Sequence, residues 1–458
     1  MNLPAVIHDN MVLQQNAEVP IWGTGEPGER MTVVMRDQRV MTTADGEGRW
    51  RVGLKPLKAG GPFEMTLSGN QTVTLHNVLV GEVWVCSGQS NIAWPVRRSL
   101  NAEQEIARAD HPMIRLFTVQ QTVADQPLQD TGGRWGVCSP ETVGDFSGTG
   151  YFFGRDLHRA LDVPVGLISS SLGGTRAEVW TSLPALQSDP DFRPFLDQWA
   201  QAMAECPDMA KIDRRAYRQP AGLYQGMVAP LIPYAIQGVV WQQGLSNADQ
   251  AYIYRKLFQG LIQEWRRAWG QGDFPFLFVQ MPSYPHAQED STVAELKESQ
   301  ATALSLPKTG MVVSMDIGEP TGDGLHFKDK QEVGRRLCLT AQAVAYGRDI
   351  VCSGPLYESM TVEGNRVRLR FKHGDGGLVA RGGLKGFMVA GPDRKFIWGA
   401  ETRIEGETLL VWSDSVQNPV AVRYAWGANP VCNLYNRAGL PASTFRTDDW
   451  PGVTYDKR

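Results

Sequence analysis

The pattern of apolar and polar positions divides the chain into three stretches. In residues 1–80, short apolar runs are separated by turn sequences such as residues 44–48. The run Met31–Met35 alternates between apolar and polar positions, and residues 19–23 and 50–54 are similar short runs. Runs of this kind, bounded by turns, are typical of strands. Residues 1–80 are therefore predicted to form a small β-sandwich or part of one.

The central stretch, residues 81–347, alternates strand-like runs with helical ones. One apolar face with helical spacing is formed by Tyr254, Leu257, Phe258, Leu261, Ile262, Trp265 and Trp269. Such alternation predicts a parallel sheet, whose ligands bind at the carboxyl ends of its strands. Residues 183–234 contain proline, aspartate and methionine and are mostly helical, which indicates an insertion that could border the site. From residue 348 to 458 the pattern returns to strands, as in Arg366–Phe371.

A serine follows the first strand of the central stretch. The apolar run Val83–Cys86 leads to Gly88, and Ser90 comes two residues later. Gly88 relaxes the backbone for a sharp turn, so that Ser90 would point out of the sheet at its edge. A serine hydroxyl is a weak nucleophile until a base takes its proton. The motif therefore indicates a nucleophile only if a histidine elsewhere in the chain can act as the base. Without such a histidine it would be a glycine-serine turn with no chemistry.

Of the seven histidines, His326 fits the role of that base. It follows the strand-like run Met311–Met315 and a glycine-containing loop, and a helical run begins at Asp329. Asp323 stands three residues before it, a spacing at which one loop can carry both the base and an acid that fixes the imidazole tautomer. Ser90, His326 and Asp323 are thus candidates for nucleophile, base and orienting acid.

Two further strand ends carry groups that acyl transfer needs. Gly173 and Gly174 follow the run Val165–Ile168, and glycines there let a backbone N–H approach a ligand closely. Asn247 comes after the run Gly238–Trp241, where its amide could donate to a developing oxyanion. Loss of one such donor typically costs about 2.7–4 kcal/mol of transition-state stabilisation. Taken singly, each block could equally be a glycine-rich turn or a helix-capping asparagine.

Together, the ordered Ser, Gly, Asn and His blocks resemble the SGNH (GDSL-like) hydrolases. The wider sequence is similar to their sialate O-acetylesterase branch, which includes bacterial carbohydrate acetylesterases. The resembling segments are residues 81–91, 147–154, 173–181, 241–248 and 326–337. The resemblance implies a three-layer α/β/α hydrolase domain with a parallel sheet, at residues 81–347. That domain would be inserted between two β-sandwich-like segments, 1–80 and 348–458, which would pack together.

The resemblance also implies roles for single residues. Ser90 would be the nucleophile and His326 the base. The backbone N–H groups of Gly174 and Ser90 and the side-chain amide of Asn247 would hold the oxyanion. Gln89 and Gln243, in the first and third of these blocks, are expected to contact the substrate.

Three positions depart from the family pattern. Leu245 stands where the family usually has glutamate, Leu172 where it has tryptophan and Phe327 where it has proline. The loop before His326 also looks longer than usual, which leaves two arrangements open. Either Asp323 completes a triad, or a backbone carbonyl orients the histidine of a Ser–His dyad.

Aromatic and basic side chains near these blocks suggest how a sugar would be held. Most of the fourteen tryptophans lie in strand or helix patterns and are expected in the core. Trp94 and Trp180 lie beside the Ser and Gly blocks and are predicted to line the pocket. Arg176 could bind a carboxylate, as sialic acid would require, or could pair with a neighbour such as Glu178.

The favoured function is a serine esterase that removes O-acetyl groups from carbohydrates. The substrate would be a sialate ester or, alternatively, acetylated xylan or xyloglucan. A non-catalytic carbohydrate-binding relative is the alternative from another class, prompted by Leu245 and Phe327. No cofactor is expected, and the oligomeric state is left open.

Charge and composition exclude several other classes. A net charge of −4 gives no basic excess for nucleic acid or membrane surfaces, and no apolar run is long enough to span a bilayer. The six cysteines lack metal-ligand spacing, so no metal is expected. The first residues have neither a basic n-region nor an apolar h-region, so no signal peptide is expected in them. We expect either an exported enzyme, secreted or periplasmic, whose signal peptide is absent from this chain, or a cytoplasmic one.

Overall fold

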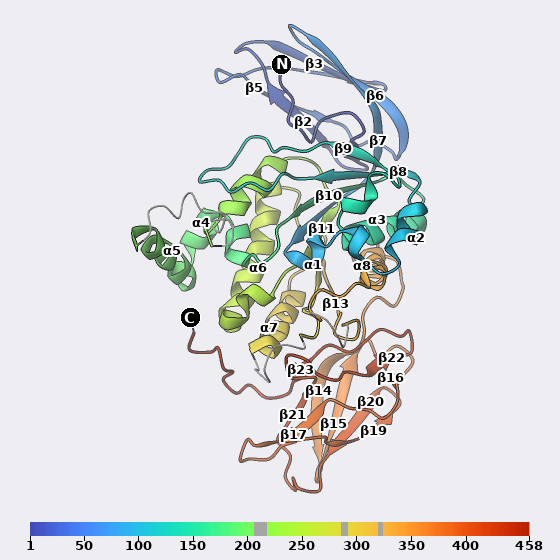
Figure 1. The fold of residues 1–458 in the computed structure, drawn as a ribbon, viewed down its shortest axis with the longest axis vertical. Helices are drawn as coiled ribbons and strands as arrows, with labels where there is room; N and C mark the ends of the chain where they lie inside the picture. Colours follow the sequence, from blue (N-terminus) through green and yellow to red (C-terminus); the bar gives the residue numbers. More distant parts are fainter. Residues whose placement is uncertain (206–217, 285–291, 319–323, 458) are drawn as a thin grey trace.

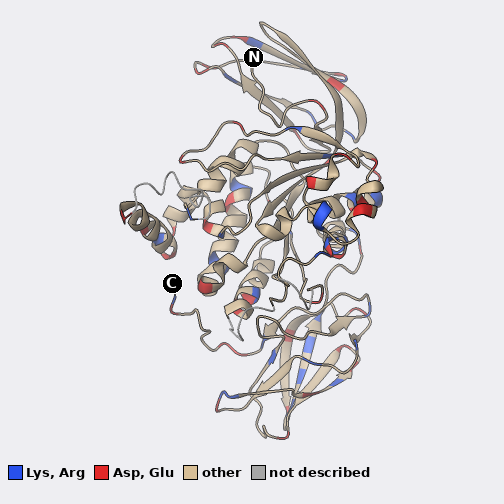
Figure 2. Cartoon of the chain, in the orientation of Figure 1, with Lys and Arg blue, Asp and Glu red and all other residues tan. Residues whose placement is uncertain are grey.

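The computed structural model describes residues 1–205, 218–284, 292–318 and 324–457. These residues form three regions along the long axis of the molecule (Figure 1). A β region built from the N-terminal residues lies at one end, an α/β region lies in the middle, and a second β region built from the C-terminal residues lies at the other end. Basic and acidic residues are interspersed over all three regions (Figure 2).

The central sheet is built around β7 (Thr72–Gly88) and has the order β13-β12-β11-β7-β10-β8-β9. Every neighbouring pair is parallel except β8 with β9. The other strands are β8 (His111–Thr118), β9 (Trp135–Cys138), β10 (Val165–Ser171), β11 (Gly238–Gln242), β12 (Phe276–Val279) and β13 (Thr309–Val312). The predicted parallel sheet is confirmed.

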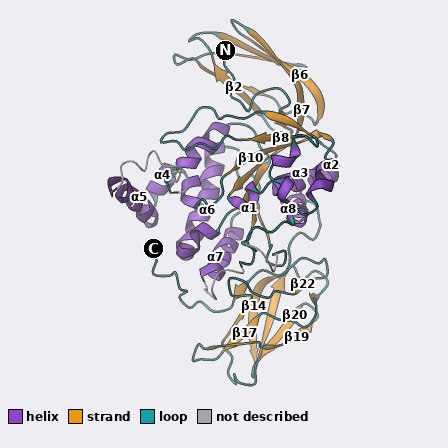
Figure 3. Ribbon diagram, viewed as in Figure 1, coloured by secondary structure: helices purple, strands orange, loops and turns teal. Residues whose placement is uncertain are grey.

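Helices cover both faces of this sheet (Figure 3). Along β7, Val83 and Val85 belong to the apolar cluster that includes α6, whereas Trp84 and Cys86 belong to the cluster that includes α3 and α8. Successive side chains of a strand point to opposite faces, so the sheet separates two helical layers. The three-layer α/β/α architecture is therefore confirmed.

The helices have the following bounds. They are α1 (Ser90–Ala93), α2 (Ala102–Ala107), α3 (Gly148–Leu161), α4 (Leu183–Ser188), α5 (Arg193–Glu205), α6 (Ala251–Trp269), α7 (Thr292–Ala301) and α8 (Lys330–Val344). Short 3₁₀ helices are η1 (Val96–Arg98), η2 (Val143–Asp145), η3 (Ala177–Trp180), η4 (Pro190–Phe192), η8 (Ala229–Leu231), η9 (Leu245–Gln250) and η10 (Thr302–Ser305), and η7 (Tyr224–Val228) is a π-helical turn. Within the predicted insertion, α4 packs against α6.

The N-terminal β region shares β7 with the central sheet. Its strands are β1 (Val12–Gln14), β2 (Val19–Thr24), β3 (Arg30–Met35), β4 (Gln38–Thr43), β5 (Arg49–Leu54) and β6 (Gly60–Ser68). Residues 72–80 of β7 pair with β6, and residues 82–88 pair with β10. Strands β2 and β5 form a separate two-stranded ribbon. The predicted division between residues 80 and 81 thus falls inside a strand.

The C-terminal region forms its own antiparallel sheets. Its strands are β14 (Leu356–Glu363), β15 (Arg366–Lys372), β16 (Leu378–Ala380), β17 (Phe387–Ala390), β18 (Phe396–Trp398), β19 (Glu401–Glu405), β20 (Thr408–Trp412), β21 (Ala421–Tyr424), β22 (Leu434–Asn436) and β23 (Phe445–Arg446). The expectation that the two β regions pack together is wrong, because they lie at opposite ends of the molecule (Figure 1). The first is fixed at the amino end of the central part of β7. The second contacts Gln280 and Asp316, which follow the carboxyl ends of β12 and β13.

Candidate active site

Ser90 lies at the carboxyl end of β7, where the chain turns into α1. Gly88 makes the turn possible: its φ is 130°, and a Cβ at this position would clash with the backbone carbonyl of Gln242 in β11. Only glycine adopts such a conformation freely. The turn leaves Ser90 half-buried at the edge of the sheet.

His326 meets Ser90 from the connection between β13 and α8. The Nε2 atom of His326 lies 2.8 Å from Oγ of Ser90, a hydrogen-bond distance. The two residues are 236 positions apart in the sequence, so the fold alone brings them together. Asp323 lies outside the described residues.

Trp94 contacts His326 through its ring face. The two ring centroids are 5.4 Å apart and the planes differ by 12°, so the rings are stacked. The indole N–H donates to the backbone carbonyl of Arg98 at 2.9 Å, and the Arg98 guanidinium carbon lies 3.9 Å from the Trp94 ring centroid. Trp94 is thus held by Arg98 through both its N–H and its ring, and its stacking restricts the orientation of the imidazole.

The glycine turn after β10 lies directly against Ser90. Leu172 donates its backbone N–H to the carbonyl of Gly88 at 3.1 Å. A Cβ on Gly173 would be 3.3 Å from Cβ of Ser90, and Gly174 has a φ of 75°. Glycine at both positions therefore allows close approach of the backbone to the serine.

Asn247 is buried beside the same edge, and its amide is held in one orientation. Its Oδ1 accepts from the backbone N–H of Ala177 at 2.9 Å and from Nε2 of Gln243 at 2.7 Å. Its Nδ2 donates to Glu178 at 2.9 Å. Because Nδ2 carries two hydrogens, this bond leaves the second for another acceptor. Burial raises the pKa of Glu178, and Arg176 at 3.7 Å opposes that rise.

Two of the expected substrate contacts are wrong. Trp180 is completely buried: its indole N–H donates to Oγ1 of Thr175 at 2.9 Å, and its ring packs edge-on against Trp241. Gln243 is also buried, and its amide binds Asn247, the carbonyl of Thr175 and the hydroxyl of Tyr254. Gln243 therefore positions Asn247 rather than a sugar.

Two more of the expected contacts, Gln89 and Arg176, are engaged by neighbouring residues to different degrees. Gln89 is 5% exposed, and its Oε1 accepts from the backbone N–H of Gly244 at 3.4 Å. Arg176 pairs with Asp249 and donates to the carbonyl of Ser246 at 2.7 Å and to Gln250 at 3.0 Å. The structure thus gives Arg176 the ion-paired arrangement rather than a free guanidinium.

A buried lysine was not anticipated by the sequence patterns. Lys330 has no exposed surface, and its Nζ donates to Oδ1 of Asn91 at 2.6 Å. The same Nζ lies 3.8 Å from the ring centroid of Phe327, so the phenyl face stabilises the cation. Asn91 in turn donates to the carbonyl of Leu325 at 2.9 Å. Asn91 thus bonds directly to Leu325 and, through Lys330, contacts Phe327, the two residues that flank His326. The position of Asn91 directly after Ser90 was the one feature of the sequence that could have indicated this role.

Neither a metal-ligand cluster nor a membrane-spanning helix is found within the described ranges. No group of three or more histidine, cysteine, aspartate or glutamate residues is arranged to hold a metal ion there. Five cysteines, all but Cys206, are described, and each is a free thiol. No helix in the described part of the chain is long and apolar enough to cross a membrane.

A serine hydroxyl hydrogen-bonded to a histidine at the carboxyl edge of a parallel sheet is the arrangement of a serine hydrolase. The chain belongs to the carbohydrate esterase family described as sialic acid-specific acetylesterase, whose model matches residues 80–343. The protein is therefore a carboxylic ester hydrolase.

Individual relatives agree along nearly the whole chain. Sialate O-acetylesterase from Pongo abelii is 32% identical, and the match covers 97% of this chain and 93% of the relative. The Homo sapiens sialate O-acetylesterase is 31% identical with the same coverage. The crystal structure of a carbohydrate acetylesterase from Xanthomonas citri superposes with a TM-score of 0.89 at 36% identity, over 98% of this chain and all of the other.

Proposed function

We propose that the protein hydrolyses O-acetyl esters of carbohydrates, with Ser90 as nucleophile and His326 as general base. The observation that carries this proposal is the 2.8 Å contact between His326 Nε2 and Ser90 Oγ. A base at that distance can take the hydroxyl proton as the oxygen attacks.

The reaction follows from these positions. Ser90 Oγ attacks the acetyl carbonyl carbon while His326 accepts the serine proton. The tetrahedral intermediate collapses when His326 passes that proton to the sugar oxygen, so that the sugar alcohol leaves and an acetyl-serine remains. Water then attacks the acetyl-serine, with His326 as base, and releases acetate and the free serine.

The oxyanion would be held by three donors: the remaining Nδ2 hydrogen of Asn247 and the backbone N–H groups of Gly174 and Ser90. The fixed amide of Asn247 supports its role, because a donor that is already oriented costs no reorganisation during the reaction. Glu178 and Gln243 would act only by positioning Asn247.

Either Asp323 or a backbone carbonyl would orient His326. Asp323→Ala separates the two possibilities. A fall in kcat of about 10³–10⁴-fold would indicate a triad, whereas a fall below about tenfold would indicate a dyad. In both cases Trp94 would support the imidazole from its face.

The state of Arg176 bears on which sugar is acetylated. Sialic acid carries a carboxylate, which a free arginine would bind in a bidentate way. Arg176 already pairs with Asp249 and lies 3.7 Å from Glu178. This pairing favours the alternative substrate, a neutral acetylated polysaccharide such as xylan or xyloglucan, over a sialate ester.

Acetate release tests the proposal. The wild type and Ser90→Ala are compared on O-acetylated sialic acid, acetylated xyloglucan, acetylated xylan and an aryl acetate. Ser90→Ala should lower kcat by about 10⁴–10⁶-fold. Ser87→Ala is the matched control, because Ser87 lies on the same strand and its buried hydroxyl has no hydrogen-bond partner within the described residues.

Two results would contradict the proposal. Full activity of Ser90→Ala would exclude this serine as the nucleophile. No release from any substrate by the wild type would favour the non-catalytic carbohydrate-binding alternative. A preference for the sialic acid ester would overturn the inference from Arg176 and leave the esterase mechanism intact.

The proposed compartment is outside the cytoplasm, where acetylated polysaccharides are met. Fractionation of the native host, followed by detection of the protein and of its esterase activity, tests this. Recovery in the cytoplasmic fraction alone would contradict it.

A further inference from the structure

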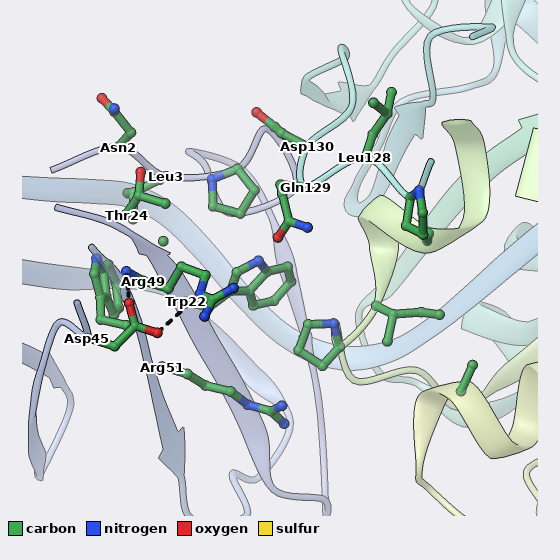
Figure 4. Close-up of a pocket in the computed structure, with 18 of the residues that line it drawn as sticks. Asn2, Leu3, Trp22, Thr24, Asp45, Arg49, Arg51, Leu128, Gln129 and Asp130 are labelled. Atoms are coloured by element: carbon green, nitrogen blue, oxygen red, sulfur yellow. Dashed lines mark hydrogen bonds and ion pairs between the residues drawn. The ribbon is translucent and has the colours of Figure 1, made fainter. Parts of the chain in front are cut away.

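A cavity of about 780 Å³ lies between the β2–β5 ribbon and the hydrolase region (Figure 4). One wall is the ribbon, and the other includes residues 127–130 and the segment 229–233. Its volume is in the range of small-molecule sites, and boundaries between structural units are common places for such sites.

The cavity is remote from Ser90. Ile232 and Pro233, which line it, precede β11, whereas Asn247 follows the carboxyl end of that strand. The part of β7 within the central sheet, residues 82–88, spans roughly 20 Å at about 3.3 Å per residue. The cavity and the catalytic residues therefore lie at opposite edges of the sheet, so one sugar unit cannot occupy both.

The ribbon presents an aromatic ring among polar groups. Trp22 pairs directly with Arg51, and Thr24 pairs with Arg49, so these four side chains share one face. Trp22 is half-buried, and its ring plane lies at 70° to that of Tyr234, with ring centroids 6.2 Å apart. Because Trp22 lines the cavity, the exposed part of its indole gives the cavity an apolar surface.

Several polar groups around that ring are unused. The side chains of Arg51, Gln129 and Asn2 are exposed, and none has a hydrogen bond or ion pair to another residue that the structure describes. In contrast, Arg49 is held by Asp45 at 3.1 Å and by Glu47 at 2.7 Å. The unused groups supply amide and guanidinium donors and amide acceptors on both walls.

The charges of the lining decide between ligand classes. Arg49 and Arg51 are balanced by Asp45 and Asp130, so the formal charge of the lining is zero. A ligand with many hydroxyl groups and no charge matches such a surface.

We propose that this cavity is a non-catalytic binding site for a neutral saccharide chain. One pyranose face would stack on Trp22, while Arg51, Gln129 and Asn2 would hydrogen-bond to its hydroxyl groups. The site would hold polysaccharide at the edge of the sheet opposite Ser90. The proposal concerns binding alone and stands whether or not Ser90 is the nucleophile.

The test measures binding of de-acetylated xyloglucan and de-acetylated xylan to the Ser90→Ala protein, by affinity gel electrophoresis and calorimetry. In the Ser90→Ala background, the further substitution Trp22→Ala should weaken binding to the preferred polysaccharide at least tenfold. Added Arg51→Ala should weaken it several-fold. Arg51 is exposed, so this variant keeps the test valid if Trp22→Ala fails to fold.

Two matched controls lie outside the cavity. Trp398 is a tryptophan of the C-terminal region that is 58% exposed, and Arg39 is an exposed arginine of the N-terminal region. Trp398→Ala and Arg39→Ala should leave binding unchanged. The proposal is overturned if neither polysaccharide binds, if Trp22→Ala and Arg51→Ala bind like their parent, or if Trp398→Ala alone removes binding.

Discussion

The two β regions are joined to the hydrolase region in different ways. The N-terminal region continues into the central sheet through β7, a single strand that pairs with β6 over residues 72–80 and with β10 over residues 82–88. The C-terminal region has separate sheets and, among the described residues, shares no strand with the central sheet. Tyr435 donates to Asp316 at 3.3 Å, and Arg446 binds Glu298 at 2.7 and 3.1 Å.

This difference separates stability from function. The N-terminal region is fixed rigidly but lies at the edge of the sheet away from Ser90. The C-terminal region contacts Asp316, in the same β13–α8 connection that carries His326. Substitutions where the C-terminal region contacts the hydrolase region should therefore alter the position of His326. Substitutions where the N-terminal region joins it should lower the stability of the whole fold.

The largest expected effect is at the C-terminal junction. Arg336 is buried and binds Asp316 with two bonds, of 2.7 and 2.9 Å, and also binds Glu332 at 2.8 Å. Arg336→Met should destabilise the protein by about 3–5 kcal/mol, because it leaves a buried carboxylate unpaired. Urea unfolding measures this loss, and kcat should fall as well. The double variant with Asp316→Asn should recover part of the stability; equal losses in both would contradict the pairing.

A proline in β7 tests the continuous strand. Leu79 lies in the middle of β7, and its backbone N–H donates to the carbonyl of Met11 at 2.9 Å. Leu79→Pro removes this donor and should cost about 3 kcal/mol. Thr72→Pro, at the first residue of the same strand, should cost much less. Unfolding followed by fluorescence and by circular dichroism should remain a single transition. Separate loss of the N-terminal region would contradict the comparison.

Lys297 predicts a pH dependence at the C-terminal junction. It is buried in α7, its Nζ donates to the carbonyl of Gly427 at 3.3 Å, and burial lowers its pKa to about 8. In the unfolded chain the pKa is about 10.4. Between these values the unfolded state holds more protons, so the free energy of unfolding rises with pH.

Between pH 7 and pH 9.5, the wild type should therefore gain about 2 kcal/mol relative to Lys297→Met. Urea unfolding at the two pH values measures the difference. Lys372→Met, which changes an exposed lysine, should follow the wild type. Parallel pH profiles for the wild type and Lys297→Met would show that the amine does not titrate in this range.

The smallest expected effect is at the Arg446–Glu298 pair, which is partly exposed. Glu298→Gln keeps the side-chain shape and removes the charge, so it should cost about 1 kcal/mol. Asp197→Asn, in the exposed pair with Arg193, is the control and should cost less than about 0.5 kcal/mol. Thermal unfolding distinguishes the two. Equal losses would mean that the bidentate pair adds nothing to the junction.

Local patterns were sufficient for much of the fold and of the site. The parallel sheet followed from runs that each strand carries within itself. Ser90 and His326 follow strand ends, and parallel strands bring their carboxyl ends to one edge. Their contact could thus be anticipated without knowing any distance. The role of Asp323 stays a prediction.

The errors concern surroundings built from distant segments. Trp180 is buried because Trp241 in β11 and Trp265 in α6 close over it. Gln243 is buried because Tyr254 and Asn247 occupy its amide. The burial of Trp180 and of Gln243 cannot be predicted from the residues that adjoin them in the sequence. The prediction that the two β regions pack together was wrong for the same reason, since their relative position depends on which edge of the central sheet each region contacts.

The continuity of β7 also determines which residues must stay together when the hydrolase region is transferred between proteins. The family model begins at residue 80, in the middle of that strand. A protein trimmed to the matched residues would lose half of its longest strand and all the partners of that half. The residues that the family model matches are therefore fewer than the residues that fold together, and exchange of the hydrolase region between proteins would have to carry residues 1–79 with it.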